Sequence, residues 1–150
     1  MSHRLALIAF VVLVLGGGLV IGYLTAPGDW YAALEKPSFN PPSWVFAPAW
    51  TLLYVAIAIA GWRAWKSDSH RWPMRLWWTQ LALNFLWSPV FFAAHRIGLA
   101  LLVISLLLAA ILLFIVAIGR HDRVAAALFA PYAAWVAFAT LLNGAIFLLN

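Results

Sequence analysis

Five apolar stretches of about 20 residues each, separated by mostly short connections, dominate the sequence. A helix rises about 1.5 Å per residue, so a stretch of this length is enough to cross the hydrocarbon core of a bilayer. The stretches are residues 5–26, 44–65, 73–94, 97–119 and 124–149. We therefore predict one domain over residues 1–150, an all-α membrane protein built as a bundle of five transmembrane helices.

The composition excludes an ordinary water-soluble domain. Of the 150 residues, 67% are hydrophobic and only 9% are charged. Soluble domains carry about 25% charged residues because they must cover their core with polar surface. The outer face of this protein is therefore expected to contact the lipid bilayer.

The nine basic residues are divided unevenly between the two ends of the predicted bundle. The end with the N-terminus would carry Arg4, Arg63, Lys66, Arg71, Arg75, Arg120 and Arg123, and the other end Lys36 and Arg96. Basic residues near helix ends are enriched on the cytoplasmic side. We expect an integral protein of a bacterial membrane with its N-terminus in the cytoplasm. Because the basic residues form no dense stripe, no nucleic-acid partner is expected.

The predicted spanning segments lack the residues that most catalytic and metal sites use. The chain has no cysteine, its acidic residues lie in the connections, and its histidines lie at segment ends. This pattern argues against a proton relay, a carboxylate pair or a histidine-ligated metal inside the membrane. We predict no metal site and no required cofactor, and expect binding by shape, stacking and a few hydrogen bonds.

Aromatic and polar residues share faces of three predicted helices, because residues three or four apart lie on one side of a helix. These sets are Trp50 with Tyr54, Gln80 with Asn84, Trp87 and Phe91, and Trp135 with Ala139 and Asn143. A lone amide in the middle of a membrane helix, such as Asn84, has two interpretations. It forms a hydrogen bond between helices, or it gives a polar contact to a ligand in an aromatic pocket.

Residues 27–43, PGDWYAALEKPSFNPPS, form the one long connection. The segment is too polar to span a membrane, and it should lie over the ends of the helices. It has two interpretations, a lid over a cavity or a simple connector at the membrane surface, where Trp30 and Tyr31 are typical.

Four parts of the chain carry motifs whose order and spacing agree with one known family. They are Trp30-Tyr31, Lys36-Pro37 and Asn40-Pro41-Pro42 with Trp44; Pro48-Ala49-Trp50-Thr51 with Tyr54; Gln80-Leu81-Ala82-Leu83-Asn84 with Trp87, Pro89 and Phe91-Phe92; and Pro131-Tyr132 with Trp135, Ala139-Thr140 and Asn143. Together they resemble the TspO/MBR family of tryptophan-rich sensory proteins and translocator proteins, once called peripheral benzodiazepine receptors.

The resemblance implies five helices around a pocket, often as a homodimer, that binds porphyrins such as protoporphyrin IX and haem. It also implies binding of synthetic aromatic ligands. Matched residue by residue, the ligand-binding set would be Trp50, Tyr54, Asn84, Trp87, Trp135 and Ala139, under a lid that holds Trp30 and Trp44.

The resemblance leaves the activity open between several classes. The leading expectation is tetrapyrrole sensing or handling. One alternative is light- and oxygen-dependent porphyrin degradation, in which Trp50 and Trp135 would be catalytic because an indole can give an electron to an excited porphyrin. Others are a transporter of porphyrin or of amphiphiles such as sterols, and a structural subunit whose aromatic residues only pack. The Tyr and basic residue of the animal proteins' sterol pattern are missing from 142–150.

Overall fold

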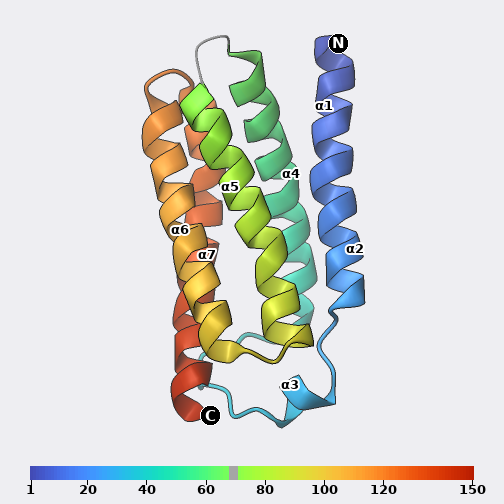
Figure 1. Ribbon diagram of the computed structural model, residues 1–150, viewed down its shortest axis with the longest axis vertical. Coiled ribbons are helices and arrows are strands. Elements are labelled where there is room, and N and C mark those ends of the chain that lie inside the picture. Colours follow the sequence, from blue (N-terminus) through green and yellow to red (C-terminus); the bar gives the residue numbers. More distant parts are fainter. Residues whose placement is uncertain (68–70) are drawn as a thin grey trace.

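The computed structural model describes residues 1–67 and 71–150, and within these ranges every regular element is helical. The elements are α1 (His3–Val11), η1 (Val12–Gly16), α2 (Gly17–Leu24), α3 (Asp29–Ala33), η2 (Ser43–Val45), α4 (Phe46–Lys66), α5 (Arg71–Ser88), η3 (Pro89–Ala93), α6 (Ile97–Gly119) and α7 (Arg123–Leu149). Figure 1 shows the long helices side by side, with the two termini at opposite ends of the bundle.

Four of the described helical stretches are long and apolar enough to cross a membrane. They are His3–Leu24, Ser43–Lys66, Ile97–Gly119 and Arg123–Leu149. The prediction of an all-α membrane protein is therefore confirmed. The other predicted span, 73–94, falls on α5 and η3, which lie in the bundle beside α6 but are less apolar than the four.

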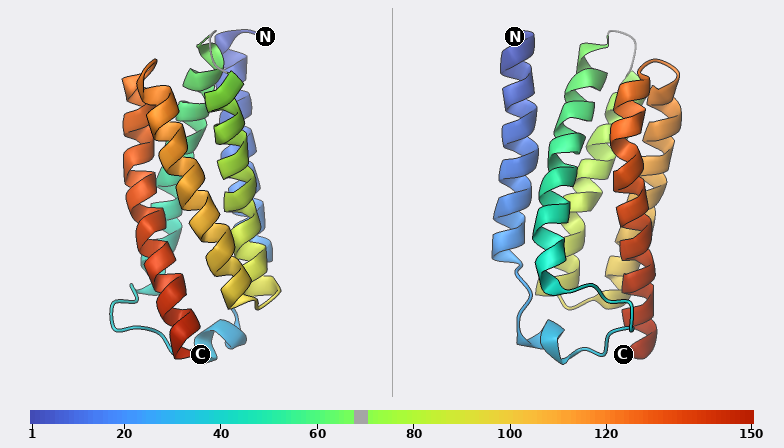
Figure 2. Two further views of the ribbon diagram at one scale, coloured as in Figure 1. Left: turned by 60° about the vertical axis from the view of Figure 1, so that its left-hand side comes forward. Right: turned by 180° about the vertical axis from the view of Figure 1, so that it is seen from behind.

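Helices that are distant in the sequence pack against each other as well as neighbouring ones. Helix α7 packs against α6 and α4, α5 packs against α6, and α1 packs against α4. The two further views in Figure 2 agree with this arrangement and show α3 beyond the helix ends, near the C-terminus. The connection 25–42 therefore lies across one end of the bundle.

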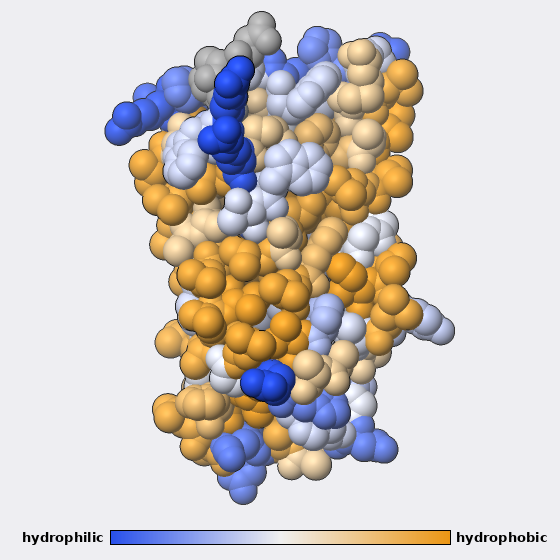
Figure 3. All heavy atoms as spheres, in the orientation of Figure 1, coloured by the Kyte–Doolittle hydropathy of each residue, from blue (hydrophilic) through white to orange (hydrophobic). Residues whose placement is uncertain are grey.

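The core and the outer surface are both apolar. Trp77, Phe114, Phe129 and Tyr132 are fully buried between helices, whereas many leucines and valines point outward. Figure 3 shows hydrophobic residues over the middle of one face and hydrophilic residues gathered toward its two ends. A contiguous apolar surface of this extent is stable in contact with lipid tails and unfavourable in water.

The end of α5 is reshaped by proline. Pro89 has no amide hydrogen to continue the α-helical ladder, and the chain continues from it as the π-helix η3. The following turn holds His95 in a left-handed conformation (φ 57°) before α6 begins. This turn brings the aromatic residues of η3 next to the connection that crosses the bundle end.

Candidate ligand-binding cavity

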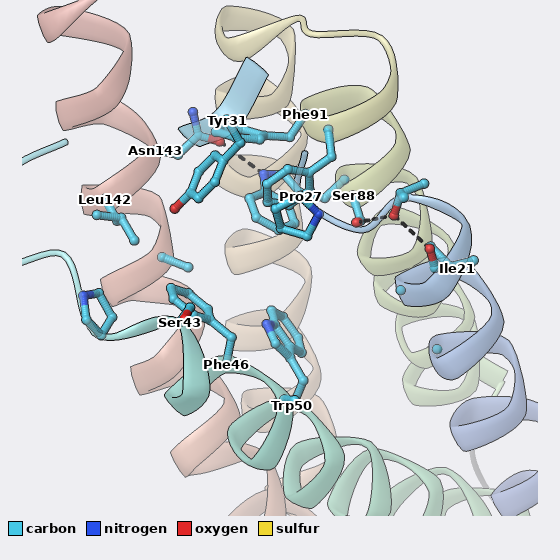
Figure 4. Close-up of a pocket in the computed structure, with 18 of the residues that line it drawn as sticks. Ile21, Pro27, Tyr31, Ser43, Phe46, Trp50, Ser88, Phe91, Leu142 and Asn143 are labelled. Atoms are coloured by element: carbon cyan, nitrogen blue, oxygen red, sulfur yellow. Dashed lines mark hydrogen bonds between the residues drawn. The ribbon is translucent and has the colours of Figure 1, made fainter. Parts of the chain in front are cut away.

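A cavity of about 790 Å³ lies inside the bundle at the end covered by the connection. Its wall is built from α2, α4, α5, η3 and α7, together with residues of the connection. Small-molecule sites in proteins usually enclose about 300–1,000 Å³. In Figure 4, Phe46 and Trp50 extend from α4 toward the space below Tyr31, and Leu142 and Asn143 face it from α7.

The structure brings six of the eight residues predicted for ligand binding into the wall of this cavity. They are Trp50, Tyr54, Asn84, Trp87, Trp135 and Ala139. The other two, Trp30 and Trp44, are not among its lining residues. Trp30 stacks on His95, with ring centroids 4.1 Å apart, and so fastens α3 to the turn before α6. The Trp44 residue is 73% exposed.

Two indoles from different helices meet at the cavity. The rings of Trp50 on α4 and Trp135 on α7 have centroids 6.4 Å apart and perpendicular planes. Tyr54 lies beside Trp50, with centroids 5.7 Å apart, and Phe46 meets Trp135 edge to face. Edge-to-face packing fixes the orientation of each ring. The wall is therefore an ordered aromatic surface.

A chain of hydrogen bonds lies behind this surface. Asn84 Nδ2 donates to Tyr132 Oη at 2.7 Å, and Tyr132 Oη donates to Gln80 Oε1 at 2.8 Å. Asn84 also lines the cavity. The sequence allowed two interpretations of this residue, an interhelical hydrogen bond or a contact in a pocket wall, and in the structure Asn84 has both positions. Gln80 shares its helix face but lies deeper, fully buried and outside the lining.

Two polar atoms in the cavity wall have no protein partner among the described residues. They are Trp135 Nε1 and Asn40 Oδ1, both shielded from solvent. A second indole nitrogen of the wall, Trp87 Nε1, donates to Asn143 Oδ1 at 3.0 Å and is satisfied. A buried donor or acceptor without a partner is costly. A polar ligand group or a water is therefore expected at Trp135 and Asn40.

The connection over the cavity is held by polar contacts that the sequence analysis did not anticipate. Lys36 Nζ donates to the carbonyl oxygens of Tyr31 and Leu34 at 2.7 and 3.0 Å. Asn150 at the C-terminus exchanges two hydrogen bonds with the backbone of Glu35, and the hydroxyls of Thr25 and Ser88 lie 2.6 Å apart. No spacing rule links such distant positions, whereas Phe46 could have been found from its four-residue spacing to Trp50.

The charge in the lining is limited to one cation. Lys36 is the single charged side chain among the lining residues that the structure describes. Those described residues also contain no group of three or more histidine, cysteine, aspartate or glutamate side chains that could hold a metal ion. The wall offers stacking surfaces, a few hydrogen-bonding groups and one positive charge. Together the fold and the cavity define a helical membrane protein with a partly open, aromatic-walled cavity at one end of its bundle.

Comparison with known proteins identifies the family. Residues 9–149 match the model of the TspO/MBR family, and this chain belongs to that family. It is 43% identical to tryptophan-rich protein TspO of Archaeoglobus fulgidus over 152 residues, which cover 97% of each chain. It is 38% identical over 128 residues to the tryptophan-rich sensory protein of Cereibacter sphaeroides, covering 85% of this chain and 81% of the relative. It is 41% identical over 119 residues to the human translocator protein, covering 76% and 70%.

Proposed function

We propose that the cavity binds a flat, mainly apolar tetrapyrrole, such as protoporphyrin IX or haem, and that the protein acts in sensing or handling this ligand. The observation that carries the proposal is the pair of perpendicular indoles, Trp50 and Trp135, in the wall of a 790 Å³ cavity. A porphyrin ring presents a large π-face and a π-edge. Two perpendicular indoles can contact both at once, one by stacking and one by its edge.

The single cation in the described lining supports a ligand with acidic groups. Lys36 has no acidic neighbour in the described wall, and its ammonium group lies 4.5 Å from the centre of the Tyr31 ring. Porphyrins with propionate side chains combine an apolar macrocycle with negative charge. A carboxylate near Lys36 would keep that charge in a favourable field while the macrocycle occupies the aromatic wall.

Binding is tested by titrating protoporphyrin IX in the dark and following the absorption of the porphyrin itself. The proposal expects saturation at a fixed stoichiometry and a spectral shift that empty detergent micelles do not give. A linear response equal to that of the micelles would mean simple partitioning and would contradict it. Because the porphyrin is observed directly, the ten tryptophans of the chain do not complicate the signal.

A second candidate activity is light- and oxygen-dependent breakdown of the bound porphyrin. The observation that favours it is that Trp50 and Trp135, either of which can give an electron to an excited porphyrin, both face the cavity. Illumination in air should then yield a new absorbing product with turnover, and Trp50→Phe with Trp135→Phe should abolish it. Bleaching at the rate of free porphyrin would rule this activity out.

We also propose the membrane arrangement. In this arrangement α5 with η3 forms a fifth span, the N-terminus faces the cytoplasm, and two copies form a homodimer. The seven basic residues at the N-terminal end support this orientation. Since the chain has no cysteine, single cysteines at the exposed residues Ser2 and Asn150 can be labelled from either side of sealed vesicles. Labelling of both from the same side would contradict five spans, and the mass in detergent decides the oligomeric state.

The names of these relatives refer to sensing and to translocation. Both roles require a bound ligand, so both are compatible with the proposal. They differ in whether porphyrin crosses the membrane. Flux of porphyrin into sealed liposomes that exceeds the flux into protein-free liposomes would favour translocation, and saturable binding without added flux would favour sensing.

A further inference from the structure

A second hollow, of about 450 Å³, lies between α5 and α6 at the other end of the bundle. It is lined by Trp72, Pro73, Leu113, Val116, Ala117, Arg120 and His121, and we call it the α5–α6 groove. We propose that the α5–α6 groove binds a phospholipid whose headgroup carries net negative charge. This proposal does not depend on the porphyrin site.

The α6 side of the groove is a row of apolar side chains, long enough to contact part of a lipid acyl chain, that ends at Arg120. Leu113, Val116, Ala117 and Arg120 follow one another at intervals of three, one and three residues, so they lie on one face of the helix. Leu113 and Val116 are 52% and 64% exposed, so this face of α6 is open to the lipid. From Leu113 to Arg120 the helix rises about 10 Å. The apolar residues thus point toward the middle of the bilayer and Arg120 toward its surface.

The α5 side supplies the features of a membrane interface. Trp72 lies in the first turn of α5 and exposes more than half of its surface, with Pro73 buried behind it. Tryptophan prefers the headgroup level of a bilayer, where its ring meets lipid carbonyls and glycerol. Trp72 and Arg120 are therefore placed at the depth where the glycerol and phosphate of a lipid lie.

The charge around the groove favours an anion. Arg71 and Arg75, one helical turn apart, flank Trp72 on α5, and both are exposed. In the part of the chain that the structure describes, the single acid at this end is Asp122, and it is paired with Arg63 at 2.8 Å. Asp68 lies outside the described residues. Figure 3 shows the corresponding face, with hydrophilic side chains at its upper end above the apolar region.

This combination selects a lipid with a net charge over the alternatives. The headgroup of phosphatidylcholine brings a cation of its own, and the groove offers that cation no acidic partner among the described residues. Free phosphate would gain from Arg120 but nothing from Leu113 and Val116. A phosphatidylglycerol molecule gains from both, because basic pockets between membrane helices attract anionic headgroups while apolar tracks take up acyl chains. His121 also lines the groove, but the proposal rests on Arg120.

The test uses the full chain in phosphatidylcholine nanodiscs that contain a trace of photoreactive lipid. Phosphatidylglycerol and phosphatidylcholine with the same diazirine-bearing acyl chain are compared, and labelled peptides are mapped by mass spectrometry. We expect phosphatidylglycerol to label residues 72–73 and 113–117 about fivefold more than phosphatidylcholine does, the preference that one nearby arginine gives. Equal labelling by the two lipids, or no labelling of these residues by either, would overturn the proposal.

Four variants separate the effect of charge from the effect of shape. Arg120→Gln should reduce phosphatidylglycerol labelling to the phosphatidylcholine level, and Arg120→Lys should keep most of the preference. Arg96→Gln, a matched loss of one exposed arginine at the opposite end, should change nothing. Val116→Trp, at an exposed position, should fill the track and reduce labelling by both lipids. A preference that survives Arg120→Gln would contradict the proposal even if every variant folds.

Discussion

The amide nitrogen of Asn84 lies 2.7 Å from the phenol oxygen of Tyr132, which connects α5 to α7 across the buried centre of the bundle. The same phenol donates to Gln80 Oε1, so one tyrosine forms hydrogen bonds with two amide side chains. The Tyr54 hydroxyl approaches Asn84 Oδ1 from the cavity side at 3.5 Å, the long limit of a hydrogen bond. Asn84, a residue of the cavity wall, is thereby held in place by Tyr132, which lies outside the lining.

Replacing Tyr132 by phenylalanine should therefore destabilise the bundle. The change leaves the Asn84 nitrogen and the Gln80 oxygen without partners, which costs about 1–2 kcal/mol in a buried or membrane setting. Unfolding in mixed micelles measures the loss. Tyr23→Phe, at a tyrosine that is 84% exposed, is the matched control and should be neutral. Equal stability of the two variants would mean that the hydrogen-bond chain contributes nothing.

Much of this arrangement could be predicted from the sequence because it depends on short-range periodicity. The spacing of Trp50 with Tyr54, of Asn84 with Trp87 and of Trp135 with Ala139 is enough to place each pair on one helix face. These faces do turn inward to a common cavity. Which residues share a helix face depends only on their spacing within one segment, so the sequence of that segment is enough to predict it.

The positions of Trp30 and Trp44 outside the cavity lining, and the contacts that the sequence did not predict, depend on long-range packing. Trp44 follows three polar or proline residues, and nothing in that local pattern shows that its ring turns outward. Trp30 stacks on His95, 65 positions further along the chain, and Glu35 bonds to Asn150, 115 positions away. Such pairings arise when the bundle end assembles, and no periodicity in one segment records them.

The exposure of Trp44 leads to a specific expectation. Trp44→Phe should leave the affinity for protoporphyrin IX within about twofold of the wild type, because the indole does not line the cavity. The same porphyrin absorption titration measures the affinity. A large loss of affinity would show that the connection closes over the ligand and brings Trp44 into the site, as the family resemblance implied.

Gly61 should tolerate no side chain. A methyl group there would overlap atoms of the Trp77 indole, which is fully buried and donates to the Ile57 carbonyl at 3.0 Å. Gly61→Ala should cost about 1–3 kcal/mol, as overpacking of a core does. Gly16→Ala is the control, since no atom outside its own turn of helix lies within 4 Å of the added carbon. Denaturation of both variants under one set of conditions tests the contrast, which would fail if Gly61→Ala were neutral.

The charge of Asp122 should make part of the stability depend on pH. Partial burial alone would raise the pKa of this carboxyl, but hydrogen bonds from Arg63 and the Ala125 amide, with the charge of Arg63, outweigh it and hold the pKa below its usual 3.8. The contribution is therefore present above about pH 4 and is lost as the pH falls further. Asp122→Asn keeps an N-cap but lacks the charge.

The stability of Asp122→Asn should consequently lie below that of the wild type at pH 6, and the gap should narrow below about pH 4. Asp122→Ala, which also removes the cap of α7, should be less stable than Asp122→Asn by about 1 kcal/mol at every pH. Thermal unfolding in detergent across this pH range provides the comparison. A gap that widens on acidification would contradict the assignment.

The most direct measurement is the affinity of protoporphyrin IX for the double variant Trp50→Phe with Trp135→Phe, followed by porphyrin absorption in the dark. Trp65→Phe with Trp78→Phe, which removes two exposed indoles outside the cavity lining, is the matched control. We expect the dissociation constant to rise roughly threefold in the first variant, since aromatic contacts contribute about 0.5–1.5 kcal/mol each and phenylalanine keeps part of them, and to stay unchanged in the control. Unchanged affinity in the first variant, or an equal loss in both, would contradict the proposed site.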